Sequence, residues 1–375
     1  MRVMIYRDYK EEGWESMQVY ADNLATSLRR MTKKLRVDEF VAFPTLSQHL
    51  ARDNKLFRYV FRFAVNPLFA PRHQGDVNHI IDQANAHLLA VLDPKKTIVT
   101  CHDLIVPYWV MHNVHPQTYK KRIKRIVELW RIGYLKKAAR IIAVSHATKK
   151  EIIDTIGINP EKIAVVPEGV DEIFTAPLLA AELRSVRLRY ALPERYVLHV
   201  GTTHEYKNME GLLKAVAHLR RNDRSLKLVK VGTPWTRSQS RLIDKLLLAP
   251  HISHLGFVPK EDLPGIYASA LSLIHPSYTE GFGFTVLEAM AAGCPVIVSD
   301  IPALREMAGA AGIYINPAIT VSDIRRIYSA IHSSQKRARL KSLGRKRATY
   351  FSWSRTAKLT DAIYREVAAQ QRKNP

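Results

Sequence analysis

Two glutamates and two glycines stand close together in the stretch 275–299, HPSYTEGFGFTVLEAMAAGCPVIVS. Gly281 and Gly283 would let backbone N–H groups approach a ligand without a clashing side chain. Glu280 precedes this glycine loop, and Glu288 lies about one turn inside the helix expected after it. The pattern therefore indicates an anion site suited to a diphosphate.

The same stretch reads as strand, loop, helix, turn and strand. Thr285 is a good N-cap residue and Gly293 a good C-cap residue, so we expect the helix to run between them. A helix N-terminus behind a glycine loop attracts negative charge. On spacing alone, a simple turn with two solvated glutamates is an equally good interpretation.

The stretch resembles the donor-site signature of family 4 of the retaining GT-B glycosyltransferases, in which seven residues separate two glutamates around the tetrapeptide EGFG. Further segments of this chain resemble that family in the right order. They are residues 145–149, residues 165–171, residues 198–201 with Lys207 and Asn208, residues 255–258 with Asp262, Leu263 and Tyr267, and residues 351–353 with Thr356 and Ala357. The likeness thus covers nearly the whole chain.

The resemblance implies roles for residues on the donor side. Glu288 would bind the ribose hydroxyls, Glu280 would contact the transferred sugar, and Lys207 would neutralise the leaving diphosphate. The N–H groups of Phe284 and Thr285 would hold the distal phosphate. The implied donor-binding set is Gly201, Thr202, Lys207, Asn208, Gly281, Phe282, Gly283, Phe284, Thr285 and Glu288.

This chain departs from the family at a second phosphate-binding cation. Many members carry an arginine where Thr202 or Tyr206 stands here. His204 or another basic residue would have to supply that charge.

On the acceptor side, His102 and Asp103 follow an expected strand and resemble the family's His-Asp element. The resemblance makes His102 a third catalytic residue, beside Glu280 and Lys207, that reaches the donor sugar or its phosphate. It also places Gly13 and Trp14 in a loop near donor and acceptor, although the usual loop has more glycines. His79 and His87 either line the same cleft or lie in the core.

Short apolar strands alternate with helices in two series, which is typical of parallel sheets covered on both faces. The expected strands are residues 1–6, 76–81, 96–100, 140–144 and 162–166, and then 196–200, 226–231, 252–255, 271–275, 295–299 and 312–315. The fold predicted is α/β with GT-B architecture, two Rossmann-like parallel-sheet domains that face each other across a cleft. We expect a first domain of residues 1–175, joined by a carboxyl-terminal helix 355–375, and a second of residues 176–354.

Composition sets wider bounds. A chain of 375 residues is long enough for two domains, each with its own core. Its 57 Lys and Arg against 34 Asp and Glu give a net charge of +23, which attracts phosphates, nucleic acid or anionic lipid. The two cysteines lie far apart, and the chain has no Asp-x-Asp dyad. We therefore expect no metal and no cofactor, with the nucleotide sugar as a substrate.

Residues 119–140 hold nine Lys or Arg and one acid. On a helix, Ile123, Val127, Trp130 and Tyr134 would form one apolar stripe that packs on the sheet. The cations either face solvent or dock on anionic lipid. Docking would suit a lipid-linked acceptor at the inner face of a membrane.

No run approaches the roughly 20 apolar residues that span a bilayer. The charges at Arg2, Arg7 and Asp8 are unlike a signal peptide, so the expected location is the cytoplasm.

The leading prediction is a metal-independent retaining glycosyltransferase that uses a UDP- or GDP-linked sugar and a hydroxyl acceptor in glycan, envelope polysaccharide or glycolipid assembly. An alternative is a basic α/β protein that binds a polyanion or nucleic acid without catalysis. No nucleic-acid motif accompanies the charge, so no nucleic-acid partner is expected. A Rossmann oxidoreductase would need a Gly-x-Gly-x-x-Gly turn after the first strand, where residues 7–13 stand instead.

Overall fold

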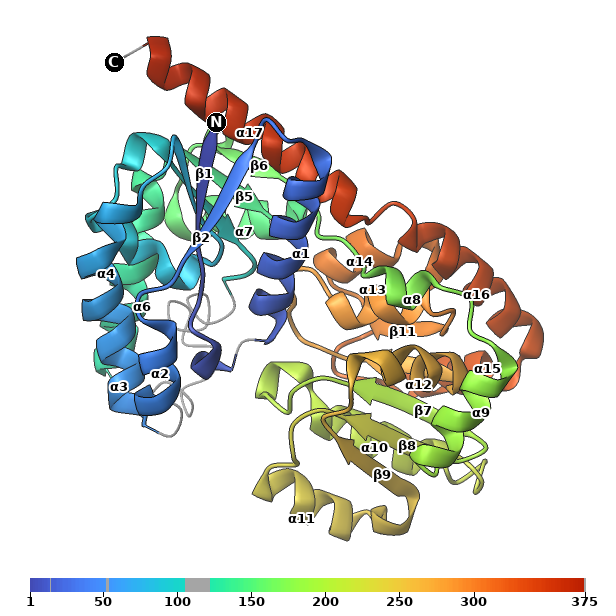
Figure 1. Ribbon diagram of the computed structural model, residues 1–375. Coiled ribbons are helices and arrows are strands. Elements are labelled where there is room, and N and C mark those ends of the chain that lie inside the picture. The colour runs from blue at the N-terminus through green and yellow to red at the C-terminus, as the bar shows by residue number, and fades with distance from the viewer. Residues whose placement is uncertain (14, 52–53, 105–121, 374–375) are drawn as a thin grey trace. The chain divides into compact units, whose positions relative to one another are not determined.

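The computed structural model describes residues 1–13, 15–51, 54–104 and 122–373 (Figure 1). The backbone divides into two units. The first unit is Met1–Gly169 with Trp353–Pro375, and the second unit is Val170–Ser352. In the part of the chain that is described, no helix is both long and apolar enough to cross a bilayer.

The first unit contains a sheet of six described strands in the order β2-β1-β3-β4-β5-β6, and every pairing is parallel. The strands are β1 (Arg2–Tyr6), β2 (Arg36–Phe40), β3 (Val77–Ile80), β4 (Thr97–Cys101), β5 (Arg140–Ala143) and β6 (Ile163–Val165). The helices are α1 (Glu15–Met31), α2 (Pro44–Ala51), α3 (Lys55–Val60), α4 (Asn66–Phe69), α6 (Arg122–Gly133), α7 (His146–Ile156) and α17 (Trp353–Lys373).

The second unit repeats the plan, with six described parallel strands in the order β12-β11-β10-β7-β8-β9. The strands are β7 (Tyr196–Val200), β8 (Lys227–Val231), β9 (Ile252–Gly256), β10 (Ser272–His275), β11 (Val296–Ser299) and β12 (Gly312–Ile315). The helices are α8 (Glu172–Thr175), α9 (Ala180–Arg189), α10 (Met209–Leu219), α11 (Arg237–Lys245), α12 (Leu263–Ser269), α13 (Phe284–Ala291), α14 (Pro302–Ala308), α15 (Val321–His332) and α16 (Ser334–Ala348). The predicted α/β fold with two parallel sheets is confirmed.

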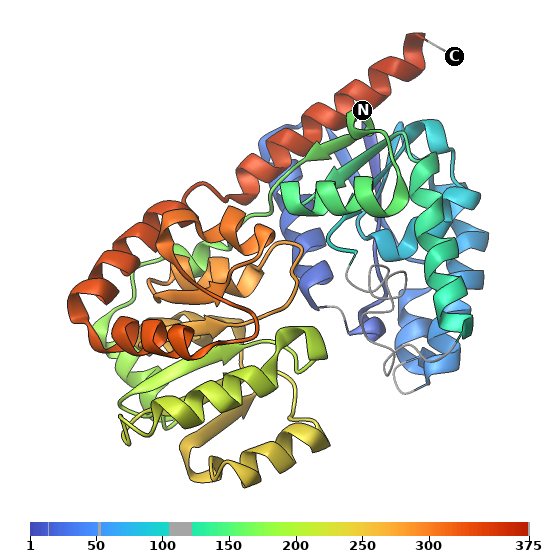
Figure 2. The same cartoon turned by 180° about the vertical axis from the view of Figure 1, so that it is seen from behind.

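Helices cover both faces of the second sheet. Seen from behind, α10 and α15 lie side by side over one face, and their apolar residues share a core with β7, β8, β10 and β11 (Figure 2). Figure 1 shows α12 and α13, which pack against each other, from the other side. Strands buried on both faces explain the nearly continuous apolar runs in the sequence.

The boundary between the units falls earlier in the chain than the sequence suggested. Residues 170–175 belong to the second unit rather than the first. The Val170 N–H donates to the Phe351 carbonyl at 3.0 Å, and α8 packs against α12 and α13. The chain therefore joins the second unit as soon as β6 and its short extension end.

Strand β2 is missing from the sequence prediction. Its residues, RVDEF, carry three charges, and only Val37 and Phe40 are buried. Among the described strands it pairs with β1 alone and lies at the edge of the sheet. A polar strand at the edge of a sheet lacks the continuous apolar run that marked the others.

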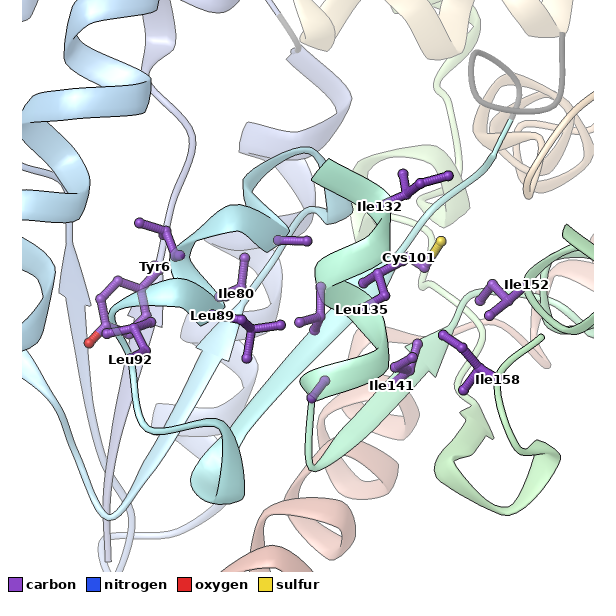
Figure 3. Close-up of a cluster of buried hydrophobic side chains, with 14 of the residues drawn as sticks. Tyr6, Ile80, Leu89, Leu92, Cys101, Ile132, Leu135, Ile141, Ile152 and Ile158 are labelled. Atoms are coloured by element: carbon purple, nitrogen blue, oxygen red, sulfur yellow. The ribbon is translucent and has the colours of Figure 1, made fainter. Parts of the chain in front are cut away.

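The buried face of α6 also differs from the predicted stripe. Ile132 packs in the core of the first unit with Leu135 from the short turn that follows α6, beside Cys101 of β4 (Figure 3). Trp130 is instead half exposed and contacts the edge of Tyr134 at 5.1 Å between ring centroids. Tyr134 packs against this core as predicted, so of these two residues only Trp130 is turned away from it.

Helix α17 is held against the first sheet by buried polar contacts. His79 of β3 bonds Tyr364 of α17 through Nδ1 at 2.6 Å and Thr100 of β4 through Nε2 at 2.7 Å. The Tyr20 hydroxyl of α1 bonds the same threonine at 3.2 Å. His79 thus lies in the core, and so does His87, whose Nε2 bonds the Arg62 carbonyl at 3.0 Å. Neither histidine lines an open site, which removes one of the two interpretations left open by the sequence.

Candidate functional site

Two loops of the second unit carry the predicted donor-side residues to one edge of its sheet. Strands β7 and β10 are parallel neighbours, so the loops that follow them leave from the same edge. The backbone N–H of Tyr278 donates to the Tyr206 carbonyl at 2.8 Å and ties the loops together. Lys207 and Glu280, which are far apart in sequence, consequently meet at this edge.

Glu280 is buried, and one of its oxygens has two partners. Lys207 Nζ and His275 Nε2 each lie 2.6 Å from Glu280 Oε1. Burial by itself would raise the pKa of Glu280, but the charge of Lys207 and the contact with His275 outweigh it and hold the pKa well below its usual range. The site therefore contains a permanently ionised carboxylate beside an ammonium group.

Sequence reasoning gave His275 no role. It is buried at the end of β10, stacks on His199 at 5.9 Å between ring centroids, and lies 3.4 Å from the Thr285 hydroxyl through Nδ1. Burial lowers the pKa of His275, so the neutral ring donates its Nε2 proton to Glu280. The only sequence signal was its place at the start of the matched stretch.

The glycine loop leads into α13 as predicted, but the helix begins earlier. Gly283, not Thr285, is the N-cap, with φ at +97°. A Cβ there would lie 2.9 Å from a methyl group of Leu304, so both conformation and space favour glycine. The predicted phosphate-binding residues Phe284 and Thr285 are the first two residues of the helix, where N–H groups point along the axis.

Glu288 lies one turn into α13 and accepts a hydrogen bond from the Tyr267 hydroxyl of α12 at 2.9 Å. Burial raises the pKa of Glu288 to about 7, despite that hydrogen bond. Lys260 pairs with Asp171 nearby and lowers the same pKa slightly. Glu288 thus changes charge near neutral pH, which the sequence did not indicate.

The residues after β7 play different parts. Gly201 is approached closely by Gly232, at which a Cβ would lie 2.4 Å from the Gly201 carbonyl. Asn208 has φ at +52° and is the N-cap of α10. Its side chain accepts from Gly211 N at 3.0 Å and donates to the Pro317 carbonyl. Within this structure Asn208 therefore shapes the loop rather than offering its side chain to a ligand.

Unsatisfied hydroxyl groups follow three neighbouring strands of the second sheet. The buried hydroxyl oxygens of Thr202, Ser277 and Ser299 have no hydrogen-bond partner among the described residues. They lie at or just after the carboxyl ends of β7, β10 and β11, adjacent in the sheet. Buried hydroxyls normally find partners, so this edge has hydrogen-bonding capacity to spare.

No second phosphate-binding cation is found at His204. Its ring stacks on Tyr206 at 5.8 Å, and Tyr206 lies under the Lys207 ammonium at 5.0 Å. Burial and the neighbouring Lys207 lower the pKa of His204. The neutral ring therefore leaves Lys207 as the cation that this loop presents.

His102 belongs to the first unit, just after β4, and both ring nitrogens are occupied. Nδ1 lies 2.6 Å from Glu168 Oε1, and Nε2 lies 2.8 Å from the Ile81 carbonyl. Burial would lower the pKa of His102, but Glu168, Asp82 and the carbonyl raise it to about 9. His102 is thus a buried imidazolium that donates two hydrogen bonds.

Gln83 positions the segment that carries His102 and Asp103. Its side-chain oxygen accepts from His102 N at 2.9 Å, and its side-chain nitrogen donates to the Asp103 carbonyl at 2.9 Å.

Burial and the nearby Asp103 raise the pKa of Glu151 to about 7. Two carboxyl groups therefore lie close together at the carboxyl end of β4.

Of the two remaining residues predicted on the acceptor side, only Gly13 is among the described residues. Gly13 is exposed and has φ at +73°, so it allows the chain to turn after residues 10–12. Trp14 lies outside the described residues. In the described part of the chain, no group of three His, Cys, Asp or Glu side chains is placed to hold a metal ion.

Comparison with known proteins matches each part of the chain to a glycosyltransferase family. The family described as Glycosyl transferases group 1 matches residues 186–347, and the family described as Glycosyltransferase Family 4 matches residues 17–173. O-antigen chain mannosyltransferase B of Escherichia coli is 30% identical over 275 residues, which are 72% of this chain and 70% of that protein. Serotype-specific mannosyltransferase WbdA of Escherichia coli is 28% identical over 278 residues, 71% of this chain but only 33% of that protein.

Among solved structures, HepE of Anabaena in complex with UDP and glucose matches with a TM-score of 0.75 and 19% identity, over 97% of this chain and 99% of HepE. At that identity the likeness concerns the fold.

Proposed function

This chain belongs to the group 1, family 4 glycosyltransferases, and we propose that it transfers a sugar, with retention of configuration and without a metal ion, from a nucleotide-diphosphate sugar to a hydroxyl acceptor. The observation that carries the proposal is the contact of Lys207 with Glu280 beside the glycine loop and the N-terminus of α13. This arrangement brings an ammonium group, a carboxylate and first-turn N–H groups to one sheet edge. A diphosphate and a sugar need these groups in close proximity.

In the proposed reaction, the bond between the sugar C1 and the diphosphate oxygen breaks while the acceptor hydroxyl attacks from the same face. The hydroxyl proton passes to the departing phosphate oxygen, so no side chain has to act as the base. Lys207 would neutralise charge that grows on the diphosphate, and Glu280 would face the positive charge that grows on the sugar. His275 would keep Glu280 hydrogen-bonded when Lys207 turns to the phosphate.

The donor is proposed to be a UDP- or GDP-linked hexose, and the acceptor a glycan or lipid-linked glycan in envelope polysaccharide or glycolipid assembly. The mannosyltransferase names of the two relatives favour a mannosyl donor, whereas the UDP bound to HepE favours uridine. A thermal-shift screen of UDP- and GDP-sugars against the whole chain tests both. Failure of every nucleotide sugar to raise the melting temperature would count against the transferase assignment, because a bound donor stabilises the folded state.

Replacing Glu288 with Ala is expected to weaken donor binding while the fold is retained. A hydrogen bond to a charged group contributes about 1.5–3 kcal/mol, so affinity should fall on the order of tenfold to a hundredfold. Because the pKa of Glu288 is about 7, donor affinity of the wild type should also fall as the pH drops below 7 and the carboxylate is protonated. Titration calorimetry at several pH values measures both effects.

The matched control is Glu288→Gln, which keeps the shape but cannot ionise. Its donor affinity should be low and independent of pH around 7. An unchanged dissociation constant in Glu288→Ala would remove this residue from the donor site.

Chelation of divalent metals is expected to leave turnover unchanged, since Lys207 and the N-terminus of α13 would compensate the negative charge of the diphosphate. The measurement is product formation in EDTA against the same enzyme supplied with Mg²⁺ or Mn²⁺. Loss of turnover on chelation and recovery on adding either metal would contradict the assignment of Lys207.

We also propose that the protein works at the inner face of a membrane as a peripheral protein. The net charge of +23 supports attraction to anionic lipid. Of the cations that first suggested this, Lys120 and Lys121 lie outside the described residues, and the side chains of Lys124 and Arg125 are not described either. The described part of the first unit has another surface that could contact a membrane.

A further inference from the structure

Helix α2 turns its large apolar residues outward. Ser47 and Ala51 face inward, where the Ser47 hydroxyl bonds Glu11 at 2.9 Å and Ala51 packs with Tyr9 and Phe61. Leu46 and Leu50 lie one turn apart on the other side and are 49% and 41% exposed. Phe43, which precedes the helix with φ at +48°, is 49% exposed, and its ring contacts Phe69 at 4.8 Å between centroids. A surface helix normally buries its large apolar residues, so this arrangement is reversed.

Helix α3 shows the same property more strongly. None of its residues is buried, and four apolar side chains are between 38% and 69% exposed. It packs against α2, and Arg58 Nε donates to the Ala51 carbonyl at 2.8 Å. We call the joint patch the α2–α3 surface. It consists of Phe43, Leu46, Leu50, Leu56, Phe57, Tyr59 and Val60.

The charges around the α2–α3 surface are mostly positive. Helix α3 carries Lys55 and Arg58, and neither helix contains an acid. The acid that contacts them, Glu11, bonds Ser47 on the inward side of α2. Exposed apolar side chains among cations are typical of helices that lie in the interface of an anionic bilayer. A second copy of this chain would instead bring like charges together.

The position of the α2–α3 surface within the first unit fits such a contact. Helix α2 follows β2, so it starts from the carboxyl edge of the sheet. The predicted acceptor-side residues His102 and Asp103 follow β4 at the same edge. Ligands of parallel α/β sheets bind at this edge.

We propose that the α2–α3 surface inserts its apolar side chains into an anionic lipid bilayer and so brings the acceptor side of the first unit to a lipid-linked acceptor. The proposal rests on the proposed function for its substrate class. It assigns membrane binding to apolar insertion by α2 and α3, with cations as a contributing attraction. The cations of residues 119–140 are therefore not the main determinant.

The test is co-sedimentation of the full chain with vesicles of phosphatidylcholine and phosphatidylglycerol. The double variant Leu46→Ser/Leu56→Ser should bind these vesicles roughly tenfold or more weakly than the wild type, because two side chains lose their burial in lipid. Both side chains are exposed in the free protein, so the fold should be unaffected. The matched control is Leu179→Ser/Leu188→Ser on the second unit, whose leucines are 67% and 81% exposed; it should bind as the wild type does.

Four results would overturn the proposal. The wild type could stay in the supernatant at low salt, or the Leu46→Ser/Leu56→Ser variant could bind as well as the wild type. Alternatively, ultracentrifugation could show a wild-type dimer that this variant dissociates while vesicle binding is unchanged. The variant Lys120→Gln/Lys121→Gln/Lys124→Gln/Arg125→Gln should bind the vesicles more tightly than Leu46→Ser/Leu56→Ser does. Weaker vesicle binding by the former would also reject the proposal.

Calorimetry with UDP and GDP on the same preparations separates this proposal from the proposed function. Normal nucleotide binding without vesicle binding rejects only the membrane surface. Vesicle binding without any nucleotide binding rejects only the transferase assignment.

Discussion

Replacing Lys207 with Met is expected to lower kcat on the order of 10²–10³-fold, because a single preorganised electrostatic contact to developing charge commonly contributes that much. Lys207 lies 2.6 Å from Glu280 and is the cation that the loop after β7 presents to the site. Its loss would leave the departing diphosphate without that compensation. Single-turnover kinetics with saturating donor measures the chemical step.

Two variants control this result. Lys207→Arg keeps the charge and should retain more activity than Lys207→Met. Lys214→Met removes an exposed lysine of α10 in the same unit and should leave kcat unchanged. If Lys207→Met kept more than half of the wild-type kcat while Lys214→Met behaved as the wild type, Lys207 would have no part in the chemistry.

Replacing Glu168 with Gln should destabilise the first unit strongly. Removing one partner of a buried ion pair costs about 3–5 kcal/mol, because the other group must either stay charged without compensation or give up its proton. Here the partner is His102, whose Nδ1 lies 2.6 Å from Glu168. The measurement is the free energy of unfolding in denaturant, with Glu161→Gln, an exposed carboxylate in the same unit, as the control.

The His102–Glu168 pair also predicts how stability depends on pH. The folded pKa of His102, about 9, is above its ordinary value of 6.5, so the folded state holds the proton more tightly. The stabilisation is fully present below pH 6.5 and is lost as the pH rises through 9. In Glu168→Gln burial should lower that pKa below 6.5, so this alkaline loss should disappear. An equal alkaline loss in both proteins would show that the pair does not cause it.

The glycine loop before α13 could be predicted from the sequence because its parts lie in one short segment. Glu280, the two glycines and Glu288 carry a local geometry of loop and helix, and that geometry is what the structure has. Both caps of the helix were misplaced, because Gly283 and Ala292 are the caps instead of Thr285 and Gly293. Gly283 serves as N-cap through its positive φ, a conformation that few other residues adopt readily.

The partners of these residues could not be predicted in the same way. Glu168 follows β6 and His102 follows β4, 66 residues apart, and neither segment indicates that both ring nitrogens are occupied. Lys207 and Glu280 meet because β7 and β10 are neighbours in the sheet although two strands separate them in sequence. The exposure of the apolar residues of α2 could not be predicted either, since their spacing is also that of a helix packed on a core.

By itself the sequence determined the alternation of strands and helices, the parallel sheets and the glycine loop before α13. These features depend on apolar runs and on the conformational freedom of glycine, which act between near neighbours in the chain. Only the tertiary structure decided which charges are paired, which histidines are buried and which apolar side chains stay exposed. These depend on strand order and on helix rotation about its own axis, because a hydrogen bond or an ion pair forms between groups that the fold brings within about 3 Å, however far apart they are in the chain.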